Sequence, residues 1–292
     1  MKLLIFGFGY TAHHLAARLR ADGVAVTATV RSAAKAEQLA RAGIAARVFS
    51  AEFRDPAIAA DIAACDAMLS SVPPDATGDP VLAAFSDAIA AAPLSSWVGY
   101  LSTIGVYGDH QGGFVDEATP LRPVEPRSRI RAAAEQAWLG LGAATGVAAH
   151  IFRLAGIYGP GRNPLVQLAA GTARRIIKPG QVFNRIHVDD IAKVIEASLR
   201  RPRGGAIYNV TDDEPAPPQD VVAFAAQLCG LPAPPDIPFE AAELSPMAKS
   251  FYSENKRVRN DLIRGELGIS LRYPSYREGL TALRAAGEGP RS

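Results

Sequence analysis

The strongest constraint on the fold is a regular alternation of short apolar runs with helical patterns through the first half of the chain. The apolar runs predict strands at 2–6, 24–30, 45–49, 66–71, 96–102 and 148–154. The periodic segments between them predict helices at 11–22, 33–42, 80–92 and 126–142. Strands that alternate with helices form βαβ units, in which helices cover both faces of a parallel sheet. The sequence therefore predicts an α/β fold with a doubly wound parallel sheet.

The texture of the chain changes after Gly159-Pro160-Gly161. Segments rich in Pro and Gly separate short helical patterns at 189–200, 218–229 and 257–267. We expect residues 1–160 to form one domain and residues 161–292 to form a smaller α/β lobe packed on it. One of the late helices and a strand at 207–210 are candidates to rejoin the main sheet.

Composition excludes several classes of protein. The 292 residues include 31 basic and 29 acidic side chains, so a net charge of +2 argues against a nucleic-acid partner. No apolar run approaches the roughly 18 residues that a membrane helix needs, and no secretory signal is recognisable. Cys65 and Cys229 match no metal or redox spacing. We therefore expect a cytoplasmic protein with no metal site and no membrane or nucleic-acid partner.

A glycine-rich turn follows the first expected strand and opens the first helix. It reads Gly7-Phe8-Gly9-Tyr10-Thr11-Ala12, which is G-x-G-x-x-A. Gly7 makes the tight turn, Gly9 lets the backbone approach a pyrophosphate, and Ala12 lets the helix pack close to the strand. The backbone of Tyr10 and Thr11 lies at the helix N-terminus, which favours anions. The turn predicts a dinucleotide site on a Rossmann fold; the alternative is a turn that binds no ligand.

The end of the second expected strand indicates which dinucleotide binds. NAD enzymes usually carry Asp or Glu there to bind the ribose 2′-hydroxyl. This chain has Arg31 and Ser32 instead, with Lys35 one turn later. A guanidinium can bind a 2′-phosphate through two hydrogen bonds, so we expect NADP(H) to be preferred over NAD(H). The alternative is that Ser32 only caps a helix and Arg31 is a solvated surface charge.

Several later segments resemble the extended short-chain dehydrogenases/reductases, the NAD(P)-dependent epimerase/dehydratase family. The resemblance spans residues 1 to about 284. The matching segments are Ser102–Gly108 (S-T-I-G-V-Y-G), Val115–Pro120, Phe152–Gly161, Arg185–Ala192, Ile207–Val210 and the tail from Asn255 to Leu280. The resemblance implies that a Ser or Thr holds the substrate oxygen, and Thr103 matches it. It further implies a catalytic Tyr and Lys in a Y-x-x-x-K motif on the next helix.

The expected Tyr and Lys are absent from that helix. The segment starts Pro126-Arg127-Ser128-Arg129-Ile130-Arg131, so Arg127 stands at the Tyr position and Arg131 at the Lys position. An arginine is not deprotonated in proteins, so Arg127 cannot act as a general acid or base. We expect Arg127 and Arg131 to stabilise negative charge electrostatically instead. A literal Y-x-x-x-K, from Tyr252 to Lys256, lies far along the chain, and we interpret it as a chance match.

The chain also resembles an atypical lineage of short-chain dehydrogenases that lacks the catalytic Tyr. Its members share the G-x-G-x-x-[GA] turn and an Arg-rich segment on the active-site helix. The resemblance implies that the loop after the fourth strand lies along the cofactor, and Ser102 is expected near it. The loop residues concerned are Ser70, Ser71, Val72 and Pro73. Arg162 and Arg185 belong to segments that frame the substrate cleft in relatives, where they would suit an anionic group.

Two functions remain open from the sequence. The first is an NADP(H)-dependent oxidoreductase or epimerase/dehydratase-like enzyme acting on a polar carbonyl or sugar-type small molecule. The second is a catalytically silent sensor that binds the dinucleotide without turnover. Thr103 favours the enzyme, whereas the missing Tyr favours the sensor. The resemblance leaves the oligomeric state as a monomer or a homodimer.

Overall fold

A computed structural model describes residues 1–92 and 97–290, and these fall into two compact units. The first unit comprises 1–103, 126–153 and 191–208, and the second comprises 104–125, 154–190 and 209–292. Each unit is therefore assembled from segments that alternate along the chain, whereas the sequence predicted contiguous domains that meet near residue 160. Segment 104–125 belongs to the second unit and segment 191–208 to the first.

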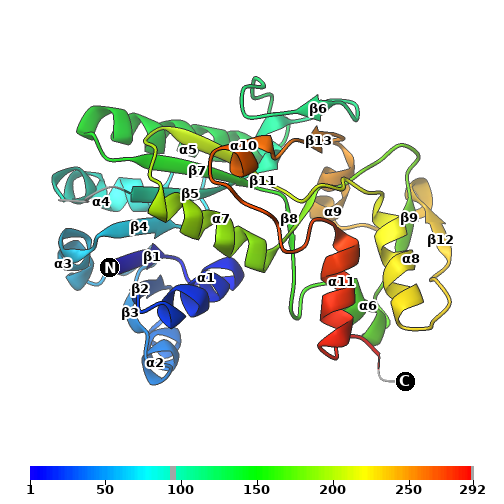
Figure 1. Cartoon of the computed structure of the whole chain (residues 1–292). Coiled ribbons are helices and arrows are strands. Elements are labelled where there is room, and N and C mark those ends of the chain that lie inside the picture. The colour runs from blue at the N-terminus through cyan, green and yellow to red at the C-terminus, as the bar shows by residue number, and fades with distance from the viewer. Residues whose placement is uncertain (93–96, 291–292) are drawn as a thin grey trace. The chain divides into compact units, whose positions relative to one another are not determined.

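The first unit is built on a parallel sheet in the order β11-β7-β5-β4-β1-β2-β3, seven strands within the described residues. Figure 1 shows these strands side by side with helices around them. The strands are β1 (Lys2–Phe6), β2 (Ala25–Val30), β3 (Ala45–Val48), β4 (Ala67–Ser70), β5 (Trp97–Thr103), β7 (Ala149–Leu154) and β11 (Ala206–Val210). The helices are α1 (Tyr10–Ala21), α2 (Ala33–Arg41), α3 (Ala57–Ala64), α4 (Pro80–Ala91), α5 (Pro126–Thr145) and α7 (Val188–Arg200). The predicted doubly wound α/β fold is confirmed.

The order in which strands are added to the sheet reverses beside β1, although the strands remain parallel. From β1 the order runs outward to β2 and β3 on one side and to β4 and β5 on the other. The pairs β1–β2, β2–β3, β1–β4 and β4–β5 are parallel. In such a sheet, ligands bind beyond the carboxyl ends of the strands at the point where the order reverses. That point lies beside the Gly7–Ala12 turn.

The core of the first unit follows the two-residue period of its strands. Leu4 and Phe6 of β1 pack with side chains of α3, α4 and α5, while β1 is buried from Leu3 to Phe6. Strands buried on both faces have apolar residues at nearly every position, which explains the unbroken apolar runs in the sequence. Phe6 also makes an edge-on contact with Phe49 just after β3, with ring centroids 5.7 Å apart.

Buried polar contacts fix the helices that cover this face. Asp79 caps α4 by accepting hydrogen bonds from the amides of Val81 at 2.9 Å and Leu82 at 3.1 Å. Its second carboxylate oxygen accepts a hydrogen bond from Trp138 Nε1 of α5 at 3.0 Å. Burial raises the pKa of the Asp79 carboxyl, although the three hydrogen bonds act in the opposite direction. One side chain therefore links the start of α4 to the middle of α5.

The second unit consists of short elements. Its strands pair in parallel as β6 (Phe114–Val115) with β13 (Arg257–Val258), β8 (Gly156–Tyr158) with β10 (Arg185–His187), and β9 (Arg175–Ile177) with β12 (Asp236–Pro238). Its helices are α6 (Pro164–Ala169), α8 (Pro218–Leu228), α9 (Pro246–Tyr252), α10 (Asp261–Gly265) and α11 (Tyr276–Ala285), with single 3₁₀ turns η1 (Ile104–Tyr107) and η2 (Phe239–Ala241). A separate apolar cluster joins α6, α8 and α11 around Leu165, Val221 and Leu280.

Several predicted boundaries differ from the structure. The segment predicted as one helix over 257–267 contains β13 and the shorter α10, and α3 of the first unit was not predicted. The strand predicted at 207–210 does join the main sheet, as β11. Ser96, the first residue of the predicted fifth strand, lies outside the described residues.

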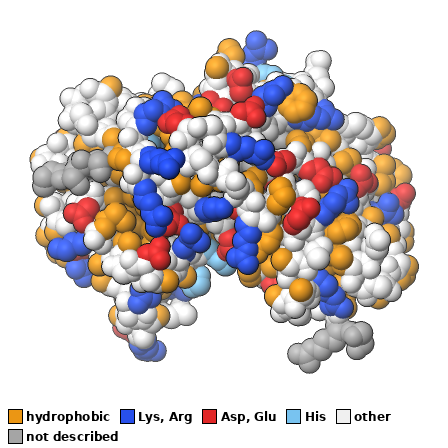
Figure 2. Space-filling model, viewed as in Figure 1, with side chains coloured by type: hydrophobic (Ala, Val, Ile, Leu, Met, Phe, Trp, Pro, Cys, Tyr) orange, Lys and Arg blue, Asp and Glu red, His pale blue; other side chains and the backbone are white. Residues whose placement is uncertain are grey.

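Charges of both signs are interspersed on the face shown in Figure 2, as the small net charge implies. Among the helices of the described chain, none combines the length and the hydropathy that crossing a membrane requires.

Replacing Asp79 with Ala is expected to lower the free energy of unfolding by about 2–3 kcal/mol. The substitution removes a helix cap and leaves the buried Trp138 N–H without its acceptor. Asp87→Ala on the exposed side of the same helix is the matched control and should change stability by less than about 0.5 kcal/mol. Urea titration of the three proteins measures the difference; equal losses for both variants would contradict the assigned role of Asp79.

Candidate cofactor site and active site

The turn after β1 is locked in place from two sides. Gly7 has φ +80°, and its amide donates a hydrogen bond to Thr29 Oγ1 on β2 at 3.0 Å. Ser71 Oγ, just after β4, donates to the Gly7 carbonyl at 2.8 Å. A Cβ at position 7 would lie 2.9 Å from Ser71 Oγ, so both the backbone conformation and the space require glycine.

Gly9 has a different role because its surroundings are open. It is the N-cap of α1 with φ −86° and has no side-chain cap, and a Cβ built there meets nothing within 4 Å. The amide of His13 donates to the Gly9 carbonyl at 2.9 Å, which closes the first helical turn. Thr11 and Ala12 are buried beneath that turn. An open helix N-terminus without a capping side chain fits a pyrophosphate, whose charge the helix dipole and N–H groups stabilise.

The four residues of the loop after β4 that were expected along the cofactor are not all accessible to a ligand. Ser70 is fully buried, and its hydroxyl has no hydrogen-bond partner among the described residues. Ser71 holds the Gly7 turn through the contact described above. Val72 is half-buried and packs against the core cluster, while Pro73 is exposed. Val72 and Pro73 are therefore the loop residues that present surface beside the turn.

Arg31 and Ser32 lie at the carboxyl end of β2, and both are exposed. Ser32 is the N-cap of α2, where its hydroxyl accepts a hydrogen bond from the Lys35 amide at 3.4 Å. Lys35 Nζ donates to Gln38 Oε1 at 2.9 Å. The capping role foreseen for Ser32 is thus present, and Arg31 carries the positive charge next to it.

The predicted catalytic residues lie at the end of β5 and in the first turns of α5. Thr103 is the last residue of β5 and is half-buried, while Arg127 is exposed one turn before Arg131 on α5. Arg131 Nη1 donates to the Leu101 carbonyl at 2.6 Å, so this arginine ties the helix to the strand. Its guanidinium carbon lies 5.9 Å from the centre of the Tyr100 ring. Burial raises the pKa of Tyr100, against the opposing effect of Arg131, so Tyr100 is a poor substitute proton donor.

Ser102 faces the interior rather than an open site. Its hydroxyl donates to Glu135 Oε1 at 2.5 Å, and Glu135 in turn binds Arg153 of β7 through an Nη2–Oε2 contact of 2.8 Å. Glu135 and Arg153 are 0% and 2% exposed. Ser102 therefore helps to position α5. This network could not be predicted from the sequence, because no local pattern pairs Glu135 with Arg153 across 18 residues.

The predicted substrate arginines both lie in the second unit. Arg162 is exposed and ends a turn in which its amide donates to the Gly159 carbonyl at 3.0 Å. Glu288, in the C-terminal tail, accepts a hydrogen bond from the Gly161 amide at 2.8 Å and so holds this turn. Arg185 is partly buried, and its Nη1 donates to the carbonyls of Phe183 at 3.0 Å and Ala216 at 3.1 Å. No motif in the sequence indicated a role for Glu288, because its contact with Gly161 spans 127 residues.

Tyr252 of the literal Y-x-x-x-K match and His187 both lie in the interior of the second unit. Tyr252 is buried between Phe183 and Phe239, with ring centroids 5.1 Å and 5.0 Å away. His187 Nδ1 accepts a hydrogen bond from the Asp189 amide at 3.2 Å, close to the start of α7. Across residues 1–92 and 97–290, no group of three His, Cys, Asp or Glu side chains is arranged to hold a metal ion.

Asp212 supplies a pH-dependent contribution to stability. It is 1% exposed, and burial raises its pKa well above the ordinary value despite the attraction of Arg185. The native state therefore keeps this proton at pH values where the unfolded chain has lost it. The contribution of Asp212 to stability falls as pH rises from about 4 through the raised pKa.

Replacing Asp212 with Asn is expected to remove that dependence. The stability of the variant relative to the parent should increase between pH 4 and pH 7, by roughly 1.4 kcal/mol for each unit by which the pKa is raised. Urea unfolding at several pH values measures it. A difference between the two proteins that does not change with pH would contradict the assignment.

Gly7→Ala and Gly9→Ala are expected to separate folding from dinucleotide binding. Gly7→Ala forces a non-glycine residue to positive φ against Ser71 and should cost about 1–3 kcal/mol of stability. Gly9→Ala has room for its Cβ and should leave the melting temperature nearly unchanged, while weakening dinucleotide binding at least about tenfold by filling the open cradle. Thermal unfolding and calorimetric titration with NADPH test both; unimpaired binding by Gly9→Ala would contradict the cradle.

Three known proteins resemble this chain over nearly its whole length. A solved structure from Silicibacter pomeroyi, described as a functionally unknown conserved protein, is 52% identical, with a TM-score of 0.88 over 98% of this chain and 99% of that one. Protein YeeZ of Escherichia coli K12 is 30% identical over 284 residues, which are 94% of this chain and 96% of YeeZ. A Streptomyces 3-diazoavenalumate denitrifying reductase is 28% identical over 311 residues, covering 96% and 99%.

Residues 3–211 match the NAD dependent epimerase/dehydratase family. The match includes the glycine turn, every strand of the central sheet up to β11, and the β5–α5 region. The chain belongs to the NAD dependent epimerase/dehydratase family.

Proposed function

We propose that this protein is an NADP(H)-dependent oxidoreductase that reduces a polar carbonyl or sugar-type small molecule. The observation that carries the proposal is the combination of an open phosphate cradle at Gly9 with an exposed arginine at the carboxyl end of β2. The cradle suits either dinucleotide, because both carry a pyrophosphate. Arg31 favours the one with the additional 2′-phosphate.

The charge around Arg31 supports this preference. Among the described residues Arg31 makes no ion pair, and the neighbouring Ser32 hydroxyl can accept or donate in addition to capping α2. No carboxylate follows β2 directly in the sequence, so a phosphate would meet no like charge from residues 31–35. Arg31 is thus the residue of this segment best suited to a bidentate contact with a phosphate.

The active-site residues suit hydride transfer with an unusual proton supply. Gly9 and Arg31 would hold a reduced dinucleotide, and its nicotinamide would supply the hydride for the carbonyl carbon. The hydroxyl of Thr103 orients the carbonyl oxygen, and Arg127 stabilises the negative charge that develops on it. Arg131 contributes at longer range, since one of its nitrogens is bound to Leu101. The proton then comes from water or from the substrate itself, because Arg127 retains its own.

The relatives favour reduction over epimerisation or dehydration. The Streptomyces relative matched across 96% of this chain is named a reductase. The dTDP-glucose 4,6-dehydratase of Streptomyces griseus matches only 44% of this chain, at 28% identity. Arg162 and Arg185 of the second unit are the proposed contacts for an anionic group of the substrate. We also propose a cytoplasmic monomer or homodimer.

One observation favours a second candidate function, a cofactor-binding sensor without turnover. Arg131 is engaged with a backbone carbonyl of β5, where a lysine of the Y-x-x-x-K type would hold the nicotinamide ribose. A protein that had lost catalysis would tolerate this change while it retained the cradle at Gly9. The two candidates differ in whether bound NADPH is consumed.

Arg31→Ala is expected to weaken NADPH binding by roughly 10- to 100-fold, the usual loss for one charge-assisted phosphate contact. NADH binding should change less than about twofold, because NADH lacks the 2′-phosphate. Arg41→Ala, at an exposed position on α2, is the control for a general loss of positive charge. Calorimetric titration gives both dissociation constants. Equal affinities of the parent protein for NADPH and NADH would refute the cofactor preference.

NADPH oxidation with a panel of polar carbonyl compounds separates enzyme from sensor. We expect at least one compound to oxidise NADPH in equal molar amount, with Thr103→Ala lowering the rate roughly 10²-fold or more. The double variant Arg127→Tyr with Arg131→Lys restores the family's side chains and tests whether a lost proton relay limits the rate. Tight NADPH binding without turnover in the parent protein and in the double variant would favour the sensor.

A further inference from the structure

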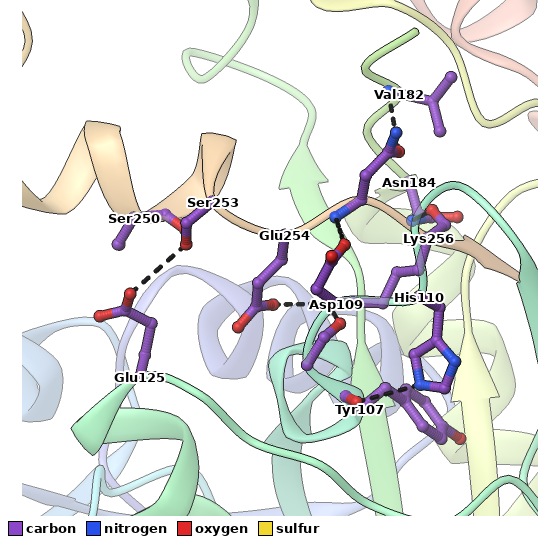
Figure 3. Close-up of polar contacts among 12 residues, drawn as sticks. Tyr107, Asp109, His110, Glu125, Val182, Asn184, Ser250, Ser253, Glu254 and Lys256 are labelled. Atoms are coloured by element: carbon purple, nitrogen blue, oxygen red, sulfur yellow. Dashed lines mark hydrogen bonds and ion pairs between the residues drawn. The ribbon is translucent and has the colours of Figure 1, made fainter.

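The segment 252–258 crosses the loop that follows Thr103 and binds it at several points within the second unit. Figure 3 shows Glu254 and Lys256 beside Asp109 and His110 of that loop. The Asn255 carbonyl accepts hydrogen bonds from the amides of His110 at 3.0 Å and Gly112 at 2.9 Å. The Asn255 amide donates to Asp109 Oδ1 at 2.8 Å. Asn255 and Asp109 are 146 residues apart in the sequence, so the contact depends on the tertiary fold.

Lys256 lies at the centre of this contact, with its charge buried. Its side chain is only 6% exposed, and Nζ donates to the Gly108 carbonyl at 2.6 Å and to Glu254 Oε2 at 2.5 Å. The Lys256 carbonyl accepts a hydrogen bond from Asn184 Nδ2 at 2.9 Å, so its backbone is fixed as well. An ammonium group is buried only where its hydrogen bonds and an opposite charge offset the loss of water.

The backbone of the loop at Gly108 requires a glycine. It has φ +73°, and a Cβ there would lie 1.9 Å from the Arg122 carbonyl oxygen. Its amide donates to the Gly105 carbonyl at 3.2 Å, which closes the 3₁₀ turn η1 that starts directly after Thr103. Tyr107, in the same turn, donates its hydroxyl hydrogen to Asn209 Oδ1 at 2.7 Å. A cation at the carbonyl end of a helical turn is favourable.

We propose that Lys256 is a positioning residue that holds the turn after Thr103 by binding the Gly108 carbonyl directly beyond it. This role rests on the proposed function of Thr103 as the residue that orients the substrate oxygen. Glu254 balances the charge of Lys256; its other oxygen, Oε1, is buried and has no hydrogen-bond partner in the described part of the chain. Glu254 therefore serves Lys256 rather than a second residue.

The charges around Lys256 agree with a buried, paired ammonium. Burial lowers the pKa of Lys256, while the hydrogen bond and charge of Glu254 and the charge of Asp109 raise it. His110 belongs to the same loop, and its Nε2 lies 3.1 Å from the Tyr107 carbonyl oxygen. The lysine thus joins a carboxylate on its own segment to a backbone carbonyl on the loop, a connection that an apolar residue of similar length cannot make.

Amide hydrogen exchange of the full chain tests this proposal without any substrate. In Lys256→Met we expect the peptide containing 104–113 to exchange at least about tenfold faster than in the parent protein, with the central sheet unchanged. Lys256→Arg keeps a charged donor for Gly108 and Glu254 and should restore most of the protection. Lys249→Met removes an exposed lysine on α9 and should change nothing. NADPH affinity should stay within about twofold in all variants.

Unchanged protection of 104–113 in folded Lys256→Met would overturn the proposal. Faster exchange spread evenly over the chain, or no rescue by Lys256→Arg, would also overturn it by showing a general role in stability. If Lys256→Met does not fold, Lys256→Gln replaces it; with one neutral donor, it should give a smaller local increase in exchange. These outcomes do not depend on turnover, so they are distinct from failure of the proposed reaction.

Discussion

The end of the sheet that carries the candidate active site depends on the buried ion pair between Glu135 and Arg153. Glu135 comes from α5 and Arg153 from β7, and Ser102 on β5 donates a further hydrogen bond to the same carboxylate. Two such charges remain buried only because each satisfies the other, and removal of one partner typically costs about 3–5 kcal/mol. The pair joins α5 to β7, and Ser102 joins the same carboxylate to β5; β5 and α5 are the elements that carry Thr103, Arg127 and Arg131.

The cofactor side of the site rests on a second constraint, the exclusion of any side chain at Gly7. The positive φ of Gly7 and the closeness of Ser71 favour glycine there, and hydrogen bonds of the turn with Thr29 and Ser71 join β2 and the β4 loop to the end of β1. The conformation at Gly7 in turn places Gly9 at the open N-terminus of α1. Two glycines of one motif therefore have different physical surroundings: Gly7 is required by the fold, and Gly9 is open, as the proposed pyrophosphate contact needs.

The sequence predicted what local pattern controls and missed what long-range contacts control. The apolar run of β1, the glycine turn and the helix cap after β2 could all be predicted from the sequence, because such patterns extend over only a few residues. Helix α3 was missed because an alanine-rich segment of eight residues carries little periodicity. The pairing of β6 with β13 and the burial of Lys256 join residues more than a hundred positions apart, which no local pattern encodes. Arg131 was expected to act on the substrate, and its bond to Leu101 appears only once α5 is packed on β5.

The most direct test of this account is a crystal structure of the protein with NADPH. We predict the pyrophosphate over Gly9 at the N-terminus of α1, and the 2′-phosphate within hydrogen-bond distance of the Arg31 guanidinium. The nicotinamide C4 should face the region of Thr103 and Arg127. A 2′-phosphate exposed to solvent away from Arg31, or a nicotinamide directed away from Thr103, would contradict the account.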